Sequence, residues 1–68
     1  MKEIAISTDY IALDQFLKFA GISETGGKAK EIILKGNVKV NKVIENKRKK
    51  KLYKNDIVEV NNQSYIIK

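Results

Sequence analysis

The strongest chemical signal in the sequence is a run of five consecutive cations: Lys47, Arg48, Lys49, Lys50 and Lys51. Adjacent like charges repel one another, so this run, which we call the lysine loop, must lie on a solvated surface. Clustered cations bind phosphate groups because each neutralised phosphate releases condensed counterions. The lysine loop therefore favours a polyanionic partner, and a merely solvated loop in a lysine-rich chain is the alternative. No amphipathic helix or lipidation motif accompanies it, so we expect no membrane partner.

A second candidate for phosphate binding is the tetrapeptide Thr25-Gly26-Gly27-Lys28. We expect Thr25 to cap a helix, whose N-terminus presents unsatisfied N–H groups and a partial positive charge. Two glycines leave these groups unshielded and Lys28 adds a full charge, which together suit a phosphate oxygen. Lys35 lies about two helical turns after Lys28 and therefore on the same face. Alternatively, the glycines only form the turn between two helices, since the spacing of a nucleotide-binding P-loop is absent.

The charge of the chain is concentrated in one segment. The 68 residues carry 14 Lys and Arg and 8 Asp and Glu, which gives a formal net charge of +6. Residues 42–54 hold seven of these cations and a single acid, Glu45, so this segment accounts for the whole excess. We therefore expect one basic surface on an otherwise neutral domain.

Catalysis and metal binding find little support in the residue types. The chain has no His and no Cys, which excludes the usual nucleophile–base pairs and the common zinc sites. Asp14 suits the first turn of a helix and Asp56 suits a turn, so both have structural explanations. A single domain spanning 1–68 buries only about 60% of its unfolded surface and hardly has room for a deep substrate cavity. We expect no enzyme activity, no catalytic residues, no metal and no cofactor.

The N-terminal residues contain no targeting signal that we recognise. Met1-Lys2-Glu3-Ile4 is followed by polar residues, so the apolar centre of a signal peptide is missing. No apolar run approaches the ~20 residues that span a bilayer. With no Cys for disulfides, a cytoplasmic location is the expectation.

Tyr53 borders the basic segment, and two roles stay open for it. It could stack on a nucleobase, or the pair Leu52-Tyr53 could anchor the lysine loop to the core, which is the commoner arrangement. The aromatic residues as a set lack the paired spacing of a base-stacking sheet. Phe19 lies at the edge of a helical stripe, so we expect it at the rim of the core.

The periodicity of apolar residues predicts two helices and several strands. Residues 13–20 place apolar side chains on one stripe, and Gly21 suits the left-handed end of that helix. A second helix is expected between Thr25 and Gly36. Alternating side chains predict strands at residues 3–7, 38–40, 43–44, 57–60 and 64–67. The sequence thus predicts an α+β fold, a two-helix hairpin packed on a small antiparallel sheet with a short N-terminal strand, in which Asn61-Asn62 forms a tight turn.

The order and spacing of several short motifs resemble the S-four RNA-binding domain, the module named for small-subunit ribosomal protein four. The motifs are Leu13-Asp14-x-Phe16-Leu17, Gly21-Ile22, Thr25, Ala29, Ile32-Ile33, Gly36-x-Val38-x-Val40-Asn41 and Asp56-x-Val58-x-Val60. They cover residues 13–60. Thr25-Gly26-Gly27-x-Ala29-Lys30 and Lys47-Arg48-x-Lys50-Lys51-Leu52 look like the stand-alone bacterial YaaA/YbcJ-like subfamily.

The resemblance implies that the second helix and the hairpin after it present a basic face to structured RNA. On this chain that face would comprise Lys28, Lys35 and the lysine loop, beside Thr25, Gly26 and Gly27. The chain departs from the family at four positions. Ala12 and Gly26 stand where the family often has arginines, and Lys42 and Asn55 stand where it usually has glycines.

Our leading hypothesis is therefore a non-catalytic, monomeric RNA-binding module for structured RNA, with ribosomal RNA among the candidates. It would bind mainly through phosphates, so that shape more than base sequence sets its preference. Two alternatives remain open at this point. The lysine loop could dock on an acidic protein partner, or the same face could bind DNA.

Overall fold

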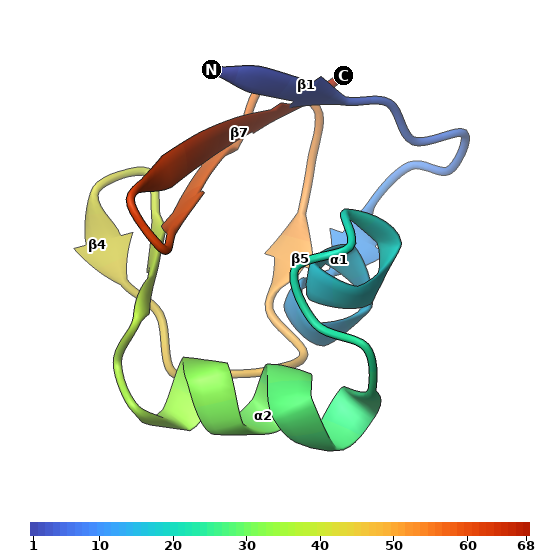
Figure 1. The fold of residues 1–68 in the computed structure, drawn as a ribbon. Coiled ribbons are helices and arrows are strands. Elements are labelled where there is room, and N and C mark those ends of the chain that lie inside the picture. Colours follow the sequence, from blue (N-terminus) through green and yellow to red (C-terminus); the bar gives the residue numbers. More distant parts are fainter.

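Two helices and seven short strands make up the computed structural model, which describes all residues from 1 to 68 (Figure 1). The helices are α1 (Leu13–Phe19) and α2 (Gly26–Leu34). The strands are β1 (Lys2–Ile4), β2 (Ile11–Ala12), β3 (Val38–Val40), β4 (Val43–Ile44), β5 (Lys51–Leu52), β6 (Ile57–Val60) and β7 (Gln63–Ile67). The predicted α+β class, with a helix pair against a small sheet, is confirmed.

The helix pair forms as the periodicity predicts. α1 buries Leu13, Phe16 and Leu17 completely, and α2 buries Ala29 and Ile33 against the same core. Gly21 and Gly36 follow the two helices with φ of 77° and 78°, the left-handed conformation that glycine adopts without a steric penalty. The Oγ1 atom of Thr25 accepts a hydrogen bond from the backbone N–H of Lys28 at 3.1 Å, so the predicted N-cap is confirmed.

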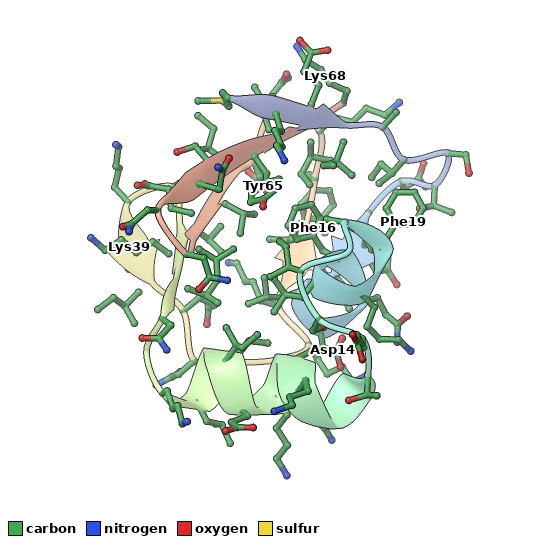
Figure 2. All side chains as sticks on the ribbon, viewed as in Figure 1. Asp14, Phe16, Phe19, Lys39, Tyr65 and Lys68 are labelled. Carbon is green, nitrogen blue, oxygen red and sulfur yellow. The ribbon has the colours of Figure 1, made fainter.

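The main sheet has the strand order β1-β7-β6-β3-β4. Its antiparallel part follows from alternating valines: Val38 pairs with Val60, and Val40 pairs with Val58. Asn61 and Asn62 form the predicted tight turn between β6 and β7 with φ of 53° and 63°. The inward side chains of these strands meet the helices in one hydrophobic core. Phe16 and Tyr65 point toward one another across this core, with ring centroids 5.9 Å apart (Figure 2).

Two pairings were not predicted. β1 joins β7 in parallel, so the sheet is mixed and not wholly antiparallel as expected; the two strands lie side by side at the top of Figure 1. β2 and β5 form a separate antiparallel ladder in which Ile11 pairs with Leu52. Phe19 also differs from the expectation, since its side chain is 62% exposed on the outer side of α1 (Figure 2).

Candidate nucleic-acid interface

The lysine loop is held to the N-terminus of α1 by its own backbone. The carbonyl oxygen of Lys50 accepts a hydrogen bond from the N–H of Leu13 at 2.8 Å, and that of Arg48 accepts one from the N–H of Asp14 at 2.9 Å. Helix N-termini leave such N–H groups without partners, and the methyl side chain of Ala12 at the cap position cannot accept a hydrogen bond from them. The lysine loop therefore caps α1, which fixes its backbone while its side chains remain outside.

The C-terminal end of the lysine loop is fixed by the small ladder. Ala12 pairs with Lys51 and Ile11 pairs with Leu52, whose side chain is completely buried. Within the loop, the N–H of Lys50 donates to the carbonyl oxygen of Lys47 at 3.1 Å. A charged segment that would be mobile on its own is thus ordered by hydrogen bonds and one buried anchor. Leu52 supplies that anchor without Tyr53, which is 50% exposed.

Lys49 differs from its neighbours in the lysine loop because it faces an acid. Its Nζ atom lies 3.0 Å from Oδ2 of Asp14, a buried carboxylate in the first turn of α1. The other oxygen of Asp14 accepts a hydrogen bond from the N–H of Gln15 at 2.8 Å. No carboxylate forms a salt bridge with the remaining members of the loop: Lys47, Arg48, Lys50 and Lys51. The charge available to a ligand therefore comes mainly from these four side chains.

The lysines predicted to share a face of α2 do so, and they share one acid. Lys28 and Lys35 lie 3.9 Å and 2.9 Å from the carboxylate of Glu31. The hydrogen bond from Lys35, together with the positive charges of Lys35 and Lys28, lowers the pKa of Glu31 below its usual value. This face of α2 thus carries two cations and one anion, so its net positive charge is smaller than that of the lysine loop.

The first turn of α2 is open, and its glycines are not required by the turn. Gly26 and Gly27 lie inside the helix and do not have the positive φ that Gly21 and Gly36 have. A Cβ atom added to Gly26 would meet no other atom within 4 Å, and one added to Gly27 would meet only Oγ1 of Thr25, at 3.9 Å. Neither the backbone conformation nor the space around them therefore requires glycine at these two positions.

The two predicted basic regions are linked through α1. α2 packs along α1, and the lysine loop caps the N-terminus of α1. In Figure 1 the yellow-to-orange chain between β4 and β5 runs at the level of α2. No hydrogen bond or salt bridge joins the lysines of α2 directly to the lysine loop, so the link between the two regions is α1.

Sequence reasoning missed one feature next to the lysine loop. Tyr10, just before β2, faces Tyr53, just after β5, with ring centroids 6.0 Å apart and an interplanar angle of 49°. The Nζ atom of Lys51 lies 4.8 Å from the centroid of the Tyr10 ring, within the range of a cation–π contact. Only the pairing of β2 with β5 brings these residues together, and strands of two residues leave no periodic pattern to detect.

A helix pair packed on a small mixed sheet, with a cationic loop capping the first helix, defines a small α+β class of domain. The S4 domain family matches residues 4–68, and this chain belongs to that family. It is also 44% identical over 57 residues to the protein of Bacillus subtilis (strain 168) named "Probable ribosome maturation protein RlbA". The aligned part covers 84% of this chain and 80% of the relative. The resemblance to the stand-alone bacterial S-four domains is thereby confirmed.

Neither helix is long and apolar enough to cross a membrane. No three side chains among His, Cys, Asp and Glu are grouped closely enough to hold a metal ion.

Proposed function

We propose that this protein is a non-catalytic module that binds structured RNA through the lysine loop, assisted by Lys28, Lys35 and the open first turn of α2. The observation that carries this proposal is the docking of the lysine loop on α1 through backbone carbonyl oxygens. This docking holds four cations without acidic partners on a fixed backbone. Membership of the S4 domain family, whose members bind RNA, supports the same function.

The mechanism follows from the geometry of the loop. Because its backbone is already ordered, binding an RNA would cost little loop entropy, and the side chains alone would need to settle on phosphates. Three of the four unpaired members are lysines, which act as point charges and lack the bidentate fork of arginine. Such contacts position a ligand without reading its bases, so the shape of the RNA backbone would set the preference.

Ribosomal RNA is the RNA that we propose, with ribosome maturation in the cytoplasm as the process and a monomer as the active form. The name of the Bacillus subtilis relative supports this choice of process. Crosslinking in cells, followed by sequencing of the bound nucleic acid, tests it. We expect the wild-type protein to recover more ribosomal RNA than a variant in which four residues are replaced by Gln. These residues are Lys47, Arg48, Lys50 and Lys51.

Two other outcomes of that experiment would redirect the proposal. Recovery of DNA in place of RNA would show a phosphate-binding face that does not distinguish the two nucleic acids. Recovery of one acidic protein, resistant to nuclease and dependent on the lysine loop, would show a protein adaptor. Competition between a structured RNA and a DNA duplex for the purified protein separates the first outcome from the proposed function.

A further inference from the structure

Two tyrosines beside the lysine loop are partly exposed. Tyr10 is 43% exposed and Tyr53 is 50% exposed, and neither belongs to the hydrophobic core. The anchor of this segment is the buried Leu52, so Tyr53 is not needed to hold the lysine loop in place. The two rings contact each other and Lys51, and both keep part of their surface open to a ligand beside the lysine loop.

Tyr53 forms one wall of a hollow of about 450 Å³. Val40 and Val43 contribute its apolar part, and Lys50 and Lys51 line the side toward the lysine loop. Ligand sites for small organic molecules have this order of volume, and they combine apolar walls with a few polar groups. The hollow can therefore accept a flat ring system whose attached charge reaches the lysines.

The two acids that line this hollow are already engaged by the protein. Asp56 accepts hydrogen bonds from the N–H of Tyr53 at 2.8 Å and from Nδ2 of Asn41 at 3.1 Å. Glu45 accepts one from the N–H of Lys47 at 3.1 Å. Two carboxyl groups inside the hollow make it a poor site for the side chains of an acidic peptide. A neutral ring with N–H donors meets acceptors there instead, which favours a nucleobase over a protein segment.

From this arrangement we infer that Tyr53 is a stacking platform for one unpaired nucleobase of the bound RNA, whose flanking phosphates contact Lys50 and Lys51. The inference rests on the proposed function and specifies the kind of RNA: structured RNA with an unpaired nucleotide next to its helix. Tyr10 acts as a positioning residue, because its ring holds the ammonium group of Lys51 at 4.8 Å. Any base can stack on one aromatic ring, so the site would recognise an unpaired nucleotide whatever its base.

Two RNA probes separate stacking from phosphate binding. One is a hairpin with a loop of adenosines, and the other is the blunt-ended RNA duplex of the same stem. Wild-type protein should bind the hairpin more tightly. Tyr53→Ala should weaken hairpin binding by about fivefold to a hundredfold, the usual effect of losing one stacked base, and leave duplex binding unchanged. Tyr53→Phe should keep the preference, and Phe19→Ala, which removes an exposed aromatic ring on α1, should bind both probes like wild type.

Tyrosine fluorescence gives an independent readout. The chain has three Tyr and no Trp, and Tyr65 is buried against Phe16. Hairpin binding should therefore quench the emission of the exposed tyrosines. Tyr53→Phe should lose much of this quenching while it keeps the affinity.

Three results would overturn the inference. Tyr53→Ala could bind both probes like wild type, or it could weaken both equally, which would make Tyr53 a mere support of the lysine loop. In either case the RNA-binding function would stand, because the wild-type protein still binds. If the wild-type protein bound neither probe, both the inference and the proposed function would be wrong. The ligand of the hollow would then be a protein.

Discussion

The Nζ atom of Lys49 lies 3.0 Å from Oδ2 of Asp14, so the middle residue of the lysine loop is paired with the helix that the loop caps. The carboxylate is buried and the lysine is 65% exposed. This contact and the two backbone hydrogen bonds to α1 hold the loop at the same place. The salt bridge between Lys49 and Asp14 therefore separates the five adjacent cations into two groups. Lys49 supports the structure, and the other four are free to contact a ligand.

Replacing Lys49 should affect folding more than RNA binding. Lys49→Met keeps the apolar stem but leaves the buried carboxylate of Asp14 without its charged partner, so we expect a loss of about 1 kcal/mol in the free energy of unfolding. Lys50→Met is the matched control, because Lys50 contributes only its backbone to the docking. It should weaken RNA binding with little change in stability. Urea denaturation and fluorescence anisotropy with an RNA hairpin measure the two effects; equal effects of the two substitutions would contradict the division of roles.

Neutralising Asp14 should have the opposite effects on stability and binding. Asp14→Asn keeps an oxygen that can accept the hydrogen bond from Gln15, but it removes a negative charge from the helix N-terminus and releases Lys49. We expect lower stability together with tighter RNA binding. The slope of log affinity against log salt should become steeper by about 0.7–0.9, the contribution of one more neutralised phosphate. Weaker RNA binding by a folded Asp14→Asn variant would argue against this exchange.

The turn after β3 is strained at a lysine. Lys42 has φ of 75°, in the left-handed region that costs a residue with a side chain about 1–2 kcal/mol. Lys42→Gly should therefore raise the free energy of unfolding by about 0.5–1 kcal/mol. Lys42→Ala is the control, because it also removes the contact with Glu59 at 3.6 Å but keeps the strained backbone. Thermal or urea unfolding that ranks the glycine variant below the alanine variant would contradict the explanation.

Glu31 should report on ligand binding at α2. Lys35 and Lys28 lower its pKa, so the carboxylate is stabilised in the folded state. A lowered pKa contributes stability that is present above the ordinary value of 4.5 and is lost as the pH falls through the folded pKa. NMR titration should show a midpoint below 4.5 that moves upward in Lys35→Gln. RNA phosphates that contact Lys28 and Lys35 would also raise this pKa, whereas an unchanged midpoint in the complex would exclude α2 from the interface.

Local signals in the sequence were sufficient for most elements of the fold. The apolar stripe of residues 13–20, the Thr25 cap and the glycines at 21 and 36 determine both helices through interactions within a few residues. Alternating valines determine β3 and β6 in the same way. The fold class therefore followed from periodicity and from helix-ending residues, before any long-range contact was known.

Apart from the exposure of Phe19, the unpredicted features depend on contacts between distant residues. β1 pairs with β7 from opposite ends of the chain, and β2 and β5 are too short to show a pattern. The lysine loop was recognised from its charge, but its docking on α1, the pairing of Lys49 with Asp14 and the meeting of Tyr10 with Tyr53 follow only from that short ladder. Composition could locate the charge of the candidate site, and tertiary structure was needed to divide its residues among roles.

The most direct test of the account is the salt dependence of RNA affinity in two variants of equal net charge. In the loop variant, Lys47, Arg48, Lys50 and Lys51 are replaced by Gln. In the control variant, the exposed lysines at positions 2, 18, 39 and 68 are replaced by Gln. Contact with four to six phosphates predicts a slope of about −3 to −5 for wild type. The control variant should keep most of this slope, and the loop variant should lose most of it together with the affinity. Equal slopes for the two variants would show that net charge, and not the lysine loop, attracts the RNA.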